Sequence, residues 1–216
     1  MGATTPRPSW RTWPPAAPAD AAAALSITTG RGDGGETGLL YGGRVPKDDL
    51  RTEAYGSLDE AISALGLARA LTEDAERAER ILTLQRELFI VGAELATGTG
   101  HRADLERHFD VVTAAMVDAL HREIHDLEAR IPLPRDFIIP GGTPTGAALD
   151  LARTLVRRAE RRAVTLQRAG ELENPDVLRY LNRCSDLLFM LAREAEQGAT
   201  VPSGGHRRRE AGGTRK

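Results

Sequence analysis

The stretch from Pro144 to Leu166, PTGAALDLARTLVRRAERRAVTL, combines an apolar stripe with an unusual density of arginine. Alanine and leucine recur in it at the spacing of one helix face, which predicts a helix that packs into a core. Arg153, Arg157 and Arg161 recur every fourth residue, so they share another face of that helix. The helix alone favours a solvated surface for these arginines. The alternative is a binding site for a polyanion, which a row of guanidinium groups suits.

Four further segments carry apolar residues at helical spacing. They run from about Asp48 to Leu71, from Thr72 to Ala96, from Asp110 to Arg130, and from Asn174-Pro175 to Glu196. Thr143 before Pro144, and Asn174 before Pro175, are typical of an N-cap followed by proline in the first turn. The pattern predicts an all-α protein, a five-helix up-and-down bundle preceded by a Gly-rich N-terminal loop.

Length and charge exclude several classes of protein. The 216 residues suit one domain of ordinary size. A formal net charge of −2 provides no basic field for nucleic acid. The single cysteine, Cys184, lies in an apolar run, which predicts a buried thiol and a reducing compartment. No apolar run approaches the ~20 residues that span a bilayer. We therefore expect a soluble, cytoplasmic protein.

The two ends of the chain lack helical periodicity. Residues 1–25 are rich in proline and alanine, and the tail over residues 197–216 is polar, so we expect both to be disordered. Arginines without an early acid faintly suggest a transit peptide, but the prolines oppose the amphipathic helix that such a peptide forms. One folded domain over residues 26–196 is expected.

A Gly-rich segment precedes the first helix. Seven glycines fall between Gly30 and Gly43, and such a segment can present backbone N–H groups to an anion. It contains no GxxxxGK[ST] motif and no GxGxxG followed by a helix. A plain loop and a phosphate-binding loop therefore remain equally open. Lys47, just before the helix, could reach an anion held by this segment.

Several isolated residues invite a functional interpretation. His121 and His125 are one helical turn apart, but no third metal ligand is evident, so we expect an exposed pair and no metal site. Phe137 lies in a connector, where the apolar pattern favours a core position over contact with a flat ligand. Asn182 and Asp186 share one helix face and require partners, either a ligand or another helix.

Two acidic residues are expected to serve the arginine face. Asp59 is a natural counter-ion for an arginine of the 144–166 helix. Glu160 lies one turn from Arg157 and can hold part of that face in place.

Five segments in order resemble the helical-bundle ATP:cob(I)alamin adenosyltransferases. They are TTGRGDGGETGLLYGGRVPKDD, EAYGSLDEAISALGLARA, FIIPGG, LARTLVRRAER and YLNRCSDLLFMLAR, and the resemblance covers about residues 26–196. It implies a homotrimer with ATP and corrinoid sites between subunits. The implied reaction transfers the 5′-deoxyadenosyl group of ATP to Co(I) of a reduced corrinoid, with triphosphate leaving. Given the resemblance, we interpret the arginine face as part of an active site and no longer as a solvated surface.

The resemblance also implies roles for individual residues. The residues that match the family's ATP loop are Thr29, Gly30, Arg31, Gly32, Thr37 and Gly38, and Lys47 matches its lysine before the first helix. The stretch that contacts the triphosphate is matched by Arg157, Arg158, Glu160 and Arg161. Asn182 matches an asparagine that contacts ATP. Arg157 is the expected catalytic arginine. Arg153 and Asp59 match an ion pair between subunits, and Phe137 matches an aromatic that presses on the lower face of the corrin.

One position departs from the family. Its members often carry a basic residue directly after the Gly-Asp of the loop, where this chain has Gly34. The basic residue of this loop is instead Arg31, two places before Asp33. Which side chain of the loop contacts phosphate therefore stays open. Mg²⁺ is expected to arrive with the nucleotide, because no dedicated protein metal site is evident.

Two other classes of function remain open. One is a non-catalytic ATP- or corrinoid-binding module that hands the finished cofactor to a dependent enzyme. The other is a purely structural helical bundle. The sequence also leaves open the reductant, and whether the corrinoid is cobalamin or the earlier cobyrinic acid a,c-diamide.

Overall fold

A computed structural model describes residues 28, 30–133, 136–196 and 198–203, and the statements below concern this part of the chain. The chain divides into two compact units, residues 1–34 and 35–216, and every helix and strand lies in the second. The expected disorder of residues 1–25 falls outside the described residues, as does most of the tail. Its described part, residues 198–203, includes a short strand.

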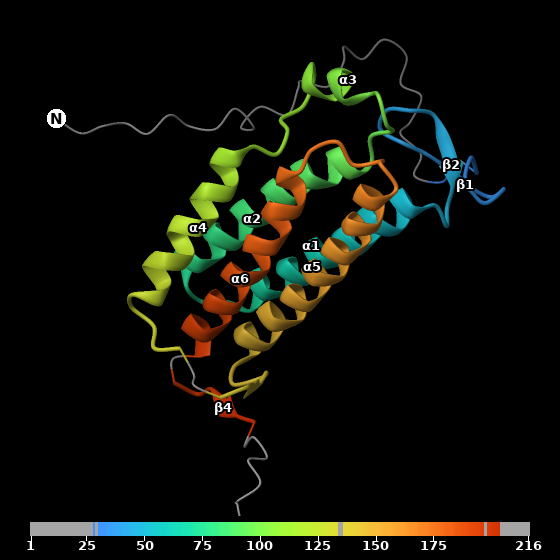
Figure 1. Cartoon of the computed structure of the whole chain (residues 1–216). Coiled ribbons are helices and arrows are strands. Elements are labelled where there is room, and N and C mark those ends of the chain that lie inside the picture. The colour runs from blue at the N-terminus through green and yellow to red at the C-terminus, as the bar shows by residue number, and fades with distance from the viewer. Residues whose placement is uncertain (1–27, 29, 134–135, 197, 204–216) are drawn as a thin grey trace, which may run out of the picture. The chain divides into compact units, whose positions relative to one another are not determined.

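Five long helices form the bundle in the second unit (Figure 1). They are α1 (Leu50–Leu71), α2 (Ala75–Leu95), α4 (Ala114–Glu128), α5 (Pro144–Arg168) and α6 (Asp176–Glu196). Consecutive helices of this set run in opposite directions, and α5 also lies antiparallel to α1. The Thr145 hydroxyl, at the start of α5, donates a hydrogen bond to the carbonyl of Leu71, the last residue of α1, at 3.0 Å. The predicted all-α, five-helix bundle is confirmed.

The structure adds short elements that the sequence did not predict. They are β1 (Glu36–Gly38), β2 (Arg44–Pro46), α3 (Arg102–Glu106), β3 (Ile138–Ile139) and β4 (Val201–Pro202). β1 pairs with β2, and β3 with β4, each as an antiparallel two-stranded sheet. Elements of two to five residues are too short to carry a hydrophobic period, so periodicity could not reveal them.

Three helices begin later than predicted, because a side-chain acceptor closer to the helix satisfies the first N–H groups. The Asp49 carboxylate accepts from the Arg51 N–H at 2.8 Å and caps α1. Asp74 rather than Thr72 caps α2. Thr113 caps α4, so the prediction that this helix starts at Asp110 is wrong.

Two predicted N-caps are confirmed. The Thr143 hydroxyl accepts from the Gly146 N–H at 3.0 Å, and Pro144 stands in the first turn of α5. The Asn174 side-chain oxygen accepts from the Asp176 N–H at 3.0 Å, where α6 begins. The caps fix where α5 and α6 start, and so which of their residues face the core.

α5 packs extensively against both α1 and α6, and the buried side chains of these three helices form much of the core. The surfaces on which α1 and α5 meet are lined by small residues: Ala54, Ala61, Ala64 and Ala68 from α1, and Ala148, Ala152, Ala159 and Ala163 from α5. Alanine at these positions lets the two backbones approach closely. No described helix is both long enough and apolar enough to cross a membrane.

The buried guanidinium of Arg51 ties α1 to α2 and to the α5–α6 connector. Its side chain is 3 % exposed. It donates to the Leu95 carbonyl at 3.2 Å and to the Thr99 hydroxyl at 3.0 Å, and it bonds both the carbonyl and the carboxylate of Glu171. The start of α1 and the end of α5 therefore lie at the same end of the bundle.

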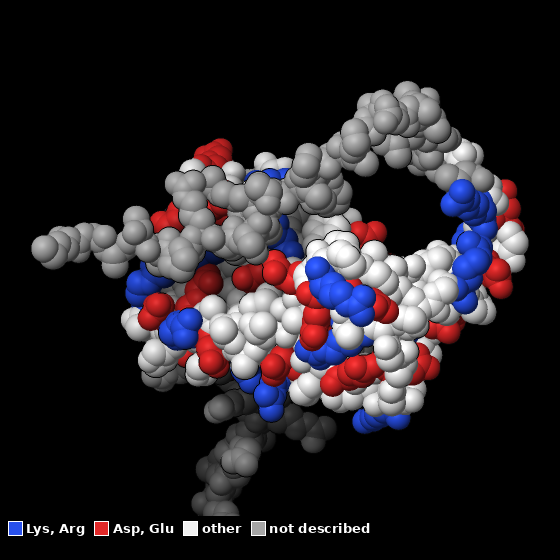
Figure 2. Space-filling view, turned by 90° about the horizontal axis from the view of Figure 1, so that it is seen from above, with Lys and Arg blue, Asp and Glu red and all other residues white. Residues whose placement is uncertain are grey.

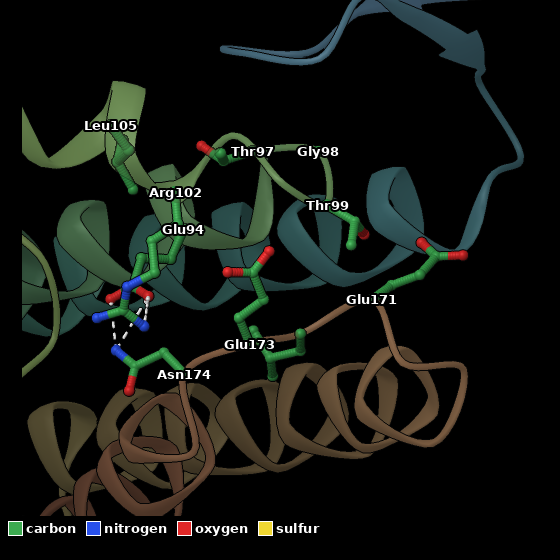
Figure 3. Close-up of a pocket in the computed structure, with 10 residues that line it drawn as sticks. Glu94, Thr97, Gly98, Thr99, Arg102, Leu105, Glu171, Glu173 and Asn174 are labelled. Carbon is green, nitrogen blue, oxygen red and sulfur yellow. Dashed lines mark hydrogen bonds and ion pairs between the residues drawn. The ribbon is translucent and has the colours of Figure 1, made fainter.

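A second buried clamp at this end joins α2 to the start of α6 (Figure 3). The Glu94 carboxylate accepts from the Val112 N–H at 2.6 Å and from the Asn174 amide at 2.9 Å. Burial raises the pKa of Glu94. The cavity beside the clamp has a volume of about 20 Å³. That is room for one water molecule and not for a nucleotide, so this pocket is structural.

The Asn174→Ala substitution tests this clamp. It removes the α6 N-cap and leaves the Glu94 carboxylate with one partner fewer, so the free energy of unfolding should fall by about 2–3 kcal/mol. Chemical denaturation measures this. The control is Glu79→Ala, which breaks an exposed pair with Arg86 (3.7 Å) and should change stability by less than about 0.5 kcal/mol. Equal effects of the two substitutions would contradict a structural role for the clamp.

Candidate functional site

The arginine-rich helix α5 presents its basic residues on more than one side. Arg157 and Arg161 are exposed on consecutive turns, and the Arg161 guanidinium donates to the Arg157 carbonyl at 3.0 Å. Arg153, one turn earlier, is half-buried. Two guanidinium groups one turn apart are therefore available on the outside of the bundle to bind an anion.

The neighbouring arginines point toward α1. Arg158 is paired with Glu60, and Arg162 with Glu53 at 3.4 Å. Asp59 was expected to be the counter-ion of an α5 arginine. Within the single chain, two glutamates of α1 have this role instead. Asp59 itself is exposed, and in the described part of the chain it makes no ion pair. Its expected pairing with Arg153 concerns a second subunit and stays a prediction.

Glu160 connects α5 to α6. Its carboxylate accepts from the Asn182 amide at 3.2 Å, so its partner inside the chain is Asn182, whereas the expected partner was Arg157. Asp186 accepts from the Arg183 guanidinium at 2.7 Å. The partners that Asn182 and Asp186 required are thus present within the chain. The amide of Asn182 is nevertheless half-buried next to the arginine-bearing helix, where a ligand of that face would meet it.

The β1–β2 hairpin contains the second half of the Gly-rich segment. Thr37 pairs with Val45 across the sheet, and its side chain lies close to Tyr55 on α1. Burial raises the pKa of Tyr55. The hairpin loop is attached to the end of α2, because the Leu40 N–H donates to the Ala96 carbonyl at 2.9 Å. Thr37 and Gly38 therefore occupy defined positions at this end of the bundle.

Close backbone contact explains one glycine of this segment. Gly42 has φ +105°, and a Cβ atom there would lie 2.9 Å from the Cα of Gly98. The Gly98 N–H also donates to the Tyr41 carbonyl at 2.8 Å. Any larger residue at position 42 would push the hairpin away from the α2–α3 loop.

Lys47 lies at the exit of the hairpin. Its backbone N–H donates to the Gly35 carbonyl at 2.8 Å, and its side chain is exposed. It stands two residues before the Asp49 cap of α1, at the end of the bundle where α5 finishes. Lys47, the hairpin and the last turns of α5 therefore share one end of the bundle.

The remaining residues expected in the ATP loop belong to the first unit. Gly30 has φ +66°, and its carbonyl accepts from the Asp33 N–H at 3.2 Å, so Gly30, Arg31, Gly32 and Asp33 form a turn. Thr29 lies outside the described residues.

Phe137 is 89 % exposed, so the core position favoured by its apolar pattern is wrong. It precedes β3 in the α4–α5 connector, and its carbonyl accepts from the Ser203 N–H at 2.7 Å. Leu133, Ile139 and Val201 nearby in the connector and in β4 are about half exposed, at 48 %, 52 % and 49 %. This end of the bundle, opposite to the hairpin, thus presents an aromatic ring among exposed apolar side chains.

Arg153 is hydrogen-bonded to a set of buried charged residues that the sequence did not reveal. Its Nε donates to Asp150 at 3.1 Å, and Asp150 accepts from the buried Arg193 of α6 at 2.5 Å. Arg193 also pairs with Glu196 at 3.2 Å. The only signal in the sequence was the i, i+3 spacing of opposite charges within α5 and within α6, which is common on solvated helices.

A groove between α4 and α6 has a volume of about 280 Å³. His121 and His125 line it and are exposed, as predicted, and the nearest acid to His125 is Glu128 at 3.9 Å. Among the described residues no group of three or more metal-binding side chains occurs.

Cys184 is fully buried, as predicted, and burial raises the pKa of its thiol.

Basic and acidic side chains are interspersed among uncharged residues on the face shown in Figure 2. The arginines of α5 therefore act as a local feature and do not form part of a general basic field.

Comparison with known proteins agrees with these features. Residues 27–195 match the family model described as cobalamin adenosyltransferase. The corrinoid adenosyltransferase of Bacillus subtilis (strain 168) is 42 % identical over 173 residues, which are 78 % of this chain and 86 % of the relative. That of Citrobacter freundii is 40 % identical over 170 residues, 79 % of this chain and 94 % of the relative.

Solved structures lead to the same family. A variant PduO-type ATP:corrinoid adenosyltransferase from Lactobacillus reuteri, in which a phenylalanine is replaced by alanine, is complexed with cobalamin and ATP. It superposes with a TM-score of 0.71 at 36 % identity, over 80 % of this chain and 94 % of that chain. An arginine-to-lysine variant complexed with ATP has a TM-score of 0.69 at 34 % identity, over 79 % and 94 % of the two chains. With a family model that spans nearly all of the helical bundle and relatives at about 40 % identity, this chain belongs to the cobalamin adenosyltransferase family.

Proposed function

We propose that this chain transfers the 5′-deoxyadenosyl group of ATP to the Co(I) of a reduced corrinoid and releases triphosphate. The observation that carries the proposal is the pair of exposed guanidinium groups on α5, in a chain about 40 % identical to corrinoid adenosyltransferases. Co(I) attacks the 5′ carbon, and the bond from that carbon to the triphosphate oxygen breaks. Both electrons of the broken bond leave with the triphosphate.

The arginine face suits the charge that develops on the leaving group. Arg157 and Arg161 can each donate two hydrogen bonds to phosphate oxygens, and the bond from the Arg161 guanidinium to the Arg157 carbonyl already orients one of the two side chains. Arg157 is the catalytic arginine in this proposal. The pair with Glu60 fixes Arg158 beside them, and the bond from Asn182 to Glu160 orients the amide toward the same site.

The Gly-rich elements complete the nucleotide site in this proposal. Thr37, Gly38 and Lys47 contribute from the hairpin end of the bundle, and Thr29, Gly30, Arg31 and Gly32 are expected to bind the nucleotide as well. Mg²⁺ would arrive with the nucleotide and would help to neutralise the charge of the phosphates. Residues 26–196 form the catalytic domain.

The spacing of these elements favours a site shared between copies of the chain. α5 has 25 residues and is therefore about 37 Å long, which exceeds the length of an extended ATP molecule. The hairpin with Lys47 lies at one end of α5, and the Phe137 connector at the other. A nucleotide bound at the hairpin therefore does not reach Phe137 of the same chain. We infer a homotrimer in which the hairpin of one subunit and Phe137 of another meet at each site.

An exposed apolar surface supports this assembly. Leu67 and Leu71 of α1 and Leu151 of α5 are 50 %, 43 % and 49 % exposed, and antiparallel packing brings them to one part of the α1–α5 surface. Asp59 lies two turns before Leu67 on α1. A subunit docked on this surface would bring Asp59 near the α5 of its neighbour, where Arg153 would supply the opposite charge.

The opposite end of the bundle suits a corrin. The Phe137 ring and its exposed apolar neighbours present an apolar surface, on which the lower face of the macrocycle would rest. Cobalamin and cobyrinic acid a,c-diamide both carry that macrocycle. A reductase that supplies Co(I) and an acceptor enzyme that uses the product are the expected partners. The buried free thiol of Cys184 supports a cytoplasmic location.

A product assay tests the reaction. Anaerobic incubation with Mg²⁺-ATP and chemically reduced cobalamin should yield adenosylcobalamin and triphosphate in equal amounts. Chromatography with phosphate-product analysis measures both. Phosphate or pyrophosphate as the primary product would overturn the proposal, and binding of both substrates without turnover would favour a non-catalytic binding module.

The Arg157→Ala substitution tests the arginine face. It removes a cation that stabilises the leaving triphosphate, so kcat should fall by about 100-fold or more. The control is Arg168→Ala, which removes an exposed arginine from the last turn of the same helix and should leave kcat unchanged. Native sedimentation of both variants shows whether the assembly survives. Equal kcat values for the two variants would contradict the assignment of Arg157 to the active site.

The Leu67→Glu substitution tests the assembly. It places a charge in the proposed contact between subunits, so sedimentation should change from three subunits toward one. The control is Phe89→Glu, at an apolar residue of α2 that is 64 % exposed outside that surface, and it should leave the trimer intact. A native chain that sediments as a monomer with full activity would contradict the shared site.

A further inference from the structure

Four charged side chains form a continuous network inside the end of the bundle that carries Phe137. Arg153 donates to Asp150 at 3.1 Å and Arg193 donates to Asp150 at 2.5 Å, and Arg193 forms an ion pair with Glu196 at 3.2 Å. Asp150, Arg193 and Glu196 are only 2 %, 4 % and 2 % exposed. Two acids and two bases make the network neutral, which permits its burial.

Glu196 attaches this network to both strands of the small sheet next to Phe137. One carboxylate oxygen accepts from the Gly142 N–H at 3.1 Å, a few residues after β3. The other accepts from the Thr200 hydroxyl at 2.8 Å, just before β4. Since β3 and β4 pair with each other and Ser203 bonds the Phe137 carbonyl, the backbone of Phe137 is held from both sides.

Close packing leaves no freedom around the Glu196 carboxylate. A Cβ atom on Gly142 would lie 2.6 Å from the Ala199 carbonyl oxygen, and one on Gly146 would lie 2.9 Å from the Cγ of Glu196. The two glycines therefore let the connector and the start of α5 close on Glu196. A side chain at either position would move the connector away from α6.

Arg193 is the centre of the network and has more donors than partners. Its Nε and Nη1 have no hydrogen-bond partner among the described residues, although the side chain is 4 % exposed. Its guanidinium carbon lies 5.0 Å from the centre of the Phe189 ring, in a cation–π contact. A buried ion pair adds little net stability but is strongly destabilising to break, so the pairs of Arg193 with Asp150 and Glu196 can fix the positions of the elements that they join.

We propose that Asp150, Arg193 and Glu196 are positioning residues that hold Phe137 and Arg153 in a fixed relation at the corrinoid end of the site. The network connects Phe137 and Arg153, the two residues that are expected to contribute to the corrinoid end of the site. A shift on one side is transmitted to the other through buried charges that cannot be left unpaired. The proposal rests on the corrinoid transferase function.

The Glu196→Gln substitution tests the proposal, because it keeps the shape but removes the charge that binds Arg193. Hydrogen exchange of residues 137–143 and 198–203 should accelerate about tenfold, while the hairpin over residues 36–47 is unchanged. In steady-state kinetics, the KM for the corrinoid should rise, or kcat fall, by about tenfold, with the KM for ATP within about twofold of native. Glu128→Gln, at an exposed acid of α4, is the control and should change none of these.

Thr200→Val is the second variant, should Glu196→Gln fail to fold. It removes one hydrogen bond to Glu196 and should accelerate exchange over the same residues by a smaller factor. Unchanged exchange at residues 137–143 in a folded variant overturns the proposal, as does an equal loss of ATP and corrinoid binding. If the native chain has no transferase activity, the proposed function fails. The exchange result still decides whether the network holds the connector.

Discussion

The close contact of α1 with α5 through alanine side chains is the constraint on which the rest of the bundle depends. Ala61 and Ala152, among others, leave no room for the longer side chains that separate helices elsewhere. With this side of α5 buried, its arginines are sorted by position. Arg158 and Arg162 meet glutamates of α1, and Arg157 and Arg161 remain outside. Packing of small residues therefore decides which guanidinium groups can meet a substrate.

The two ends of the bundle then acquire different characters. At one end, Arg51 and the Glu94–Asn174 clamp hold the helix ends together beneath the Gly-rich hairpin. At the other end, buried charges around Arg193 hold a connector that exposes Phe137. A polar, glycine-rich end suits phosphate and a rigid apolar end suits a corrin, and α5 connects them. The length of α5 is the physical reason for expecting the reaction to occur between subunits.

Helical periodicity predicted the five long helices and the caps at Thr143 and Asn174, because these features depend on local sequence. It could not predict the short strands, nor the partners of charged residues, which depend on tertiary contacts. Glu160 was expected to hold Arg157 and instead bonds Asn182. The apolar pattern around Phe137 favoured the core, and the residue is exposed. The residues of the nucleotide site were suggested by resemblance to a family. The buried network of Asp150, Arg193 and Glu196 was visible only once the helices were assembled.

The central claim is that the outer arginines of α5 bind the triphosphate of ATP. A crystal structure of the chain with Mg²⁺-ATP measures this most directly. The account predicts phosphate oxygens within hydrogen-bond distance of the Arg157 and Arg161 guanidinium groups, with a hairpin from a neighbouring copy of the chain at the same nucleotide. ATP bound in the α4–α6 groove, with Arg157 and Arg161 facing solvent, would contradict it.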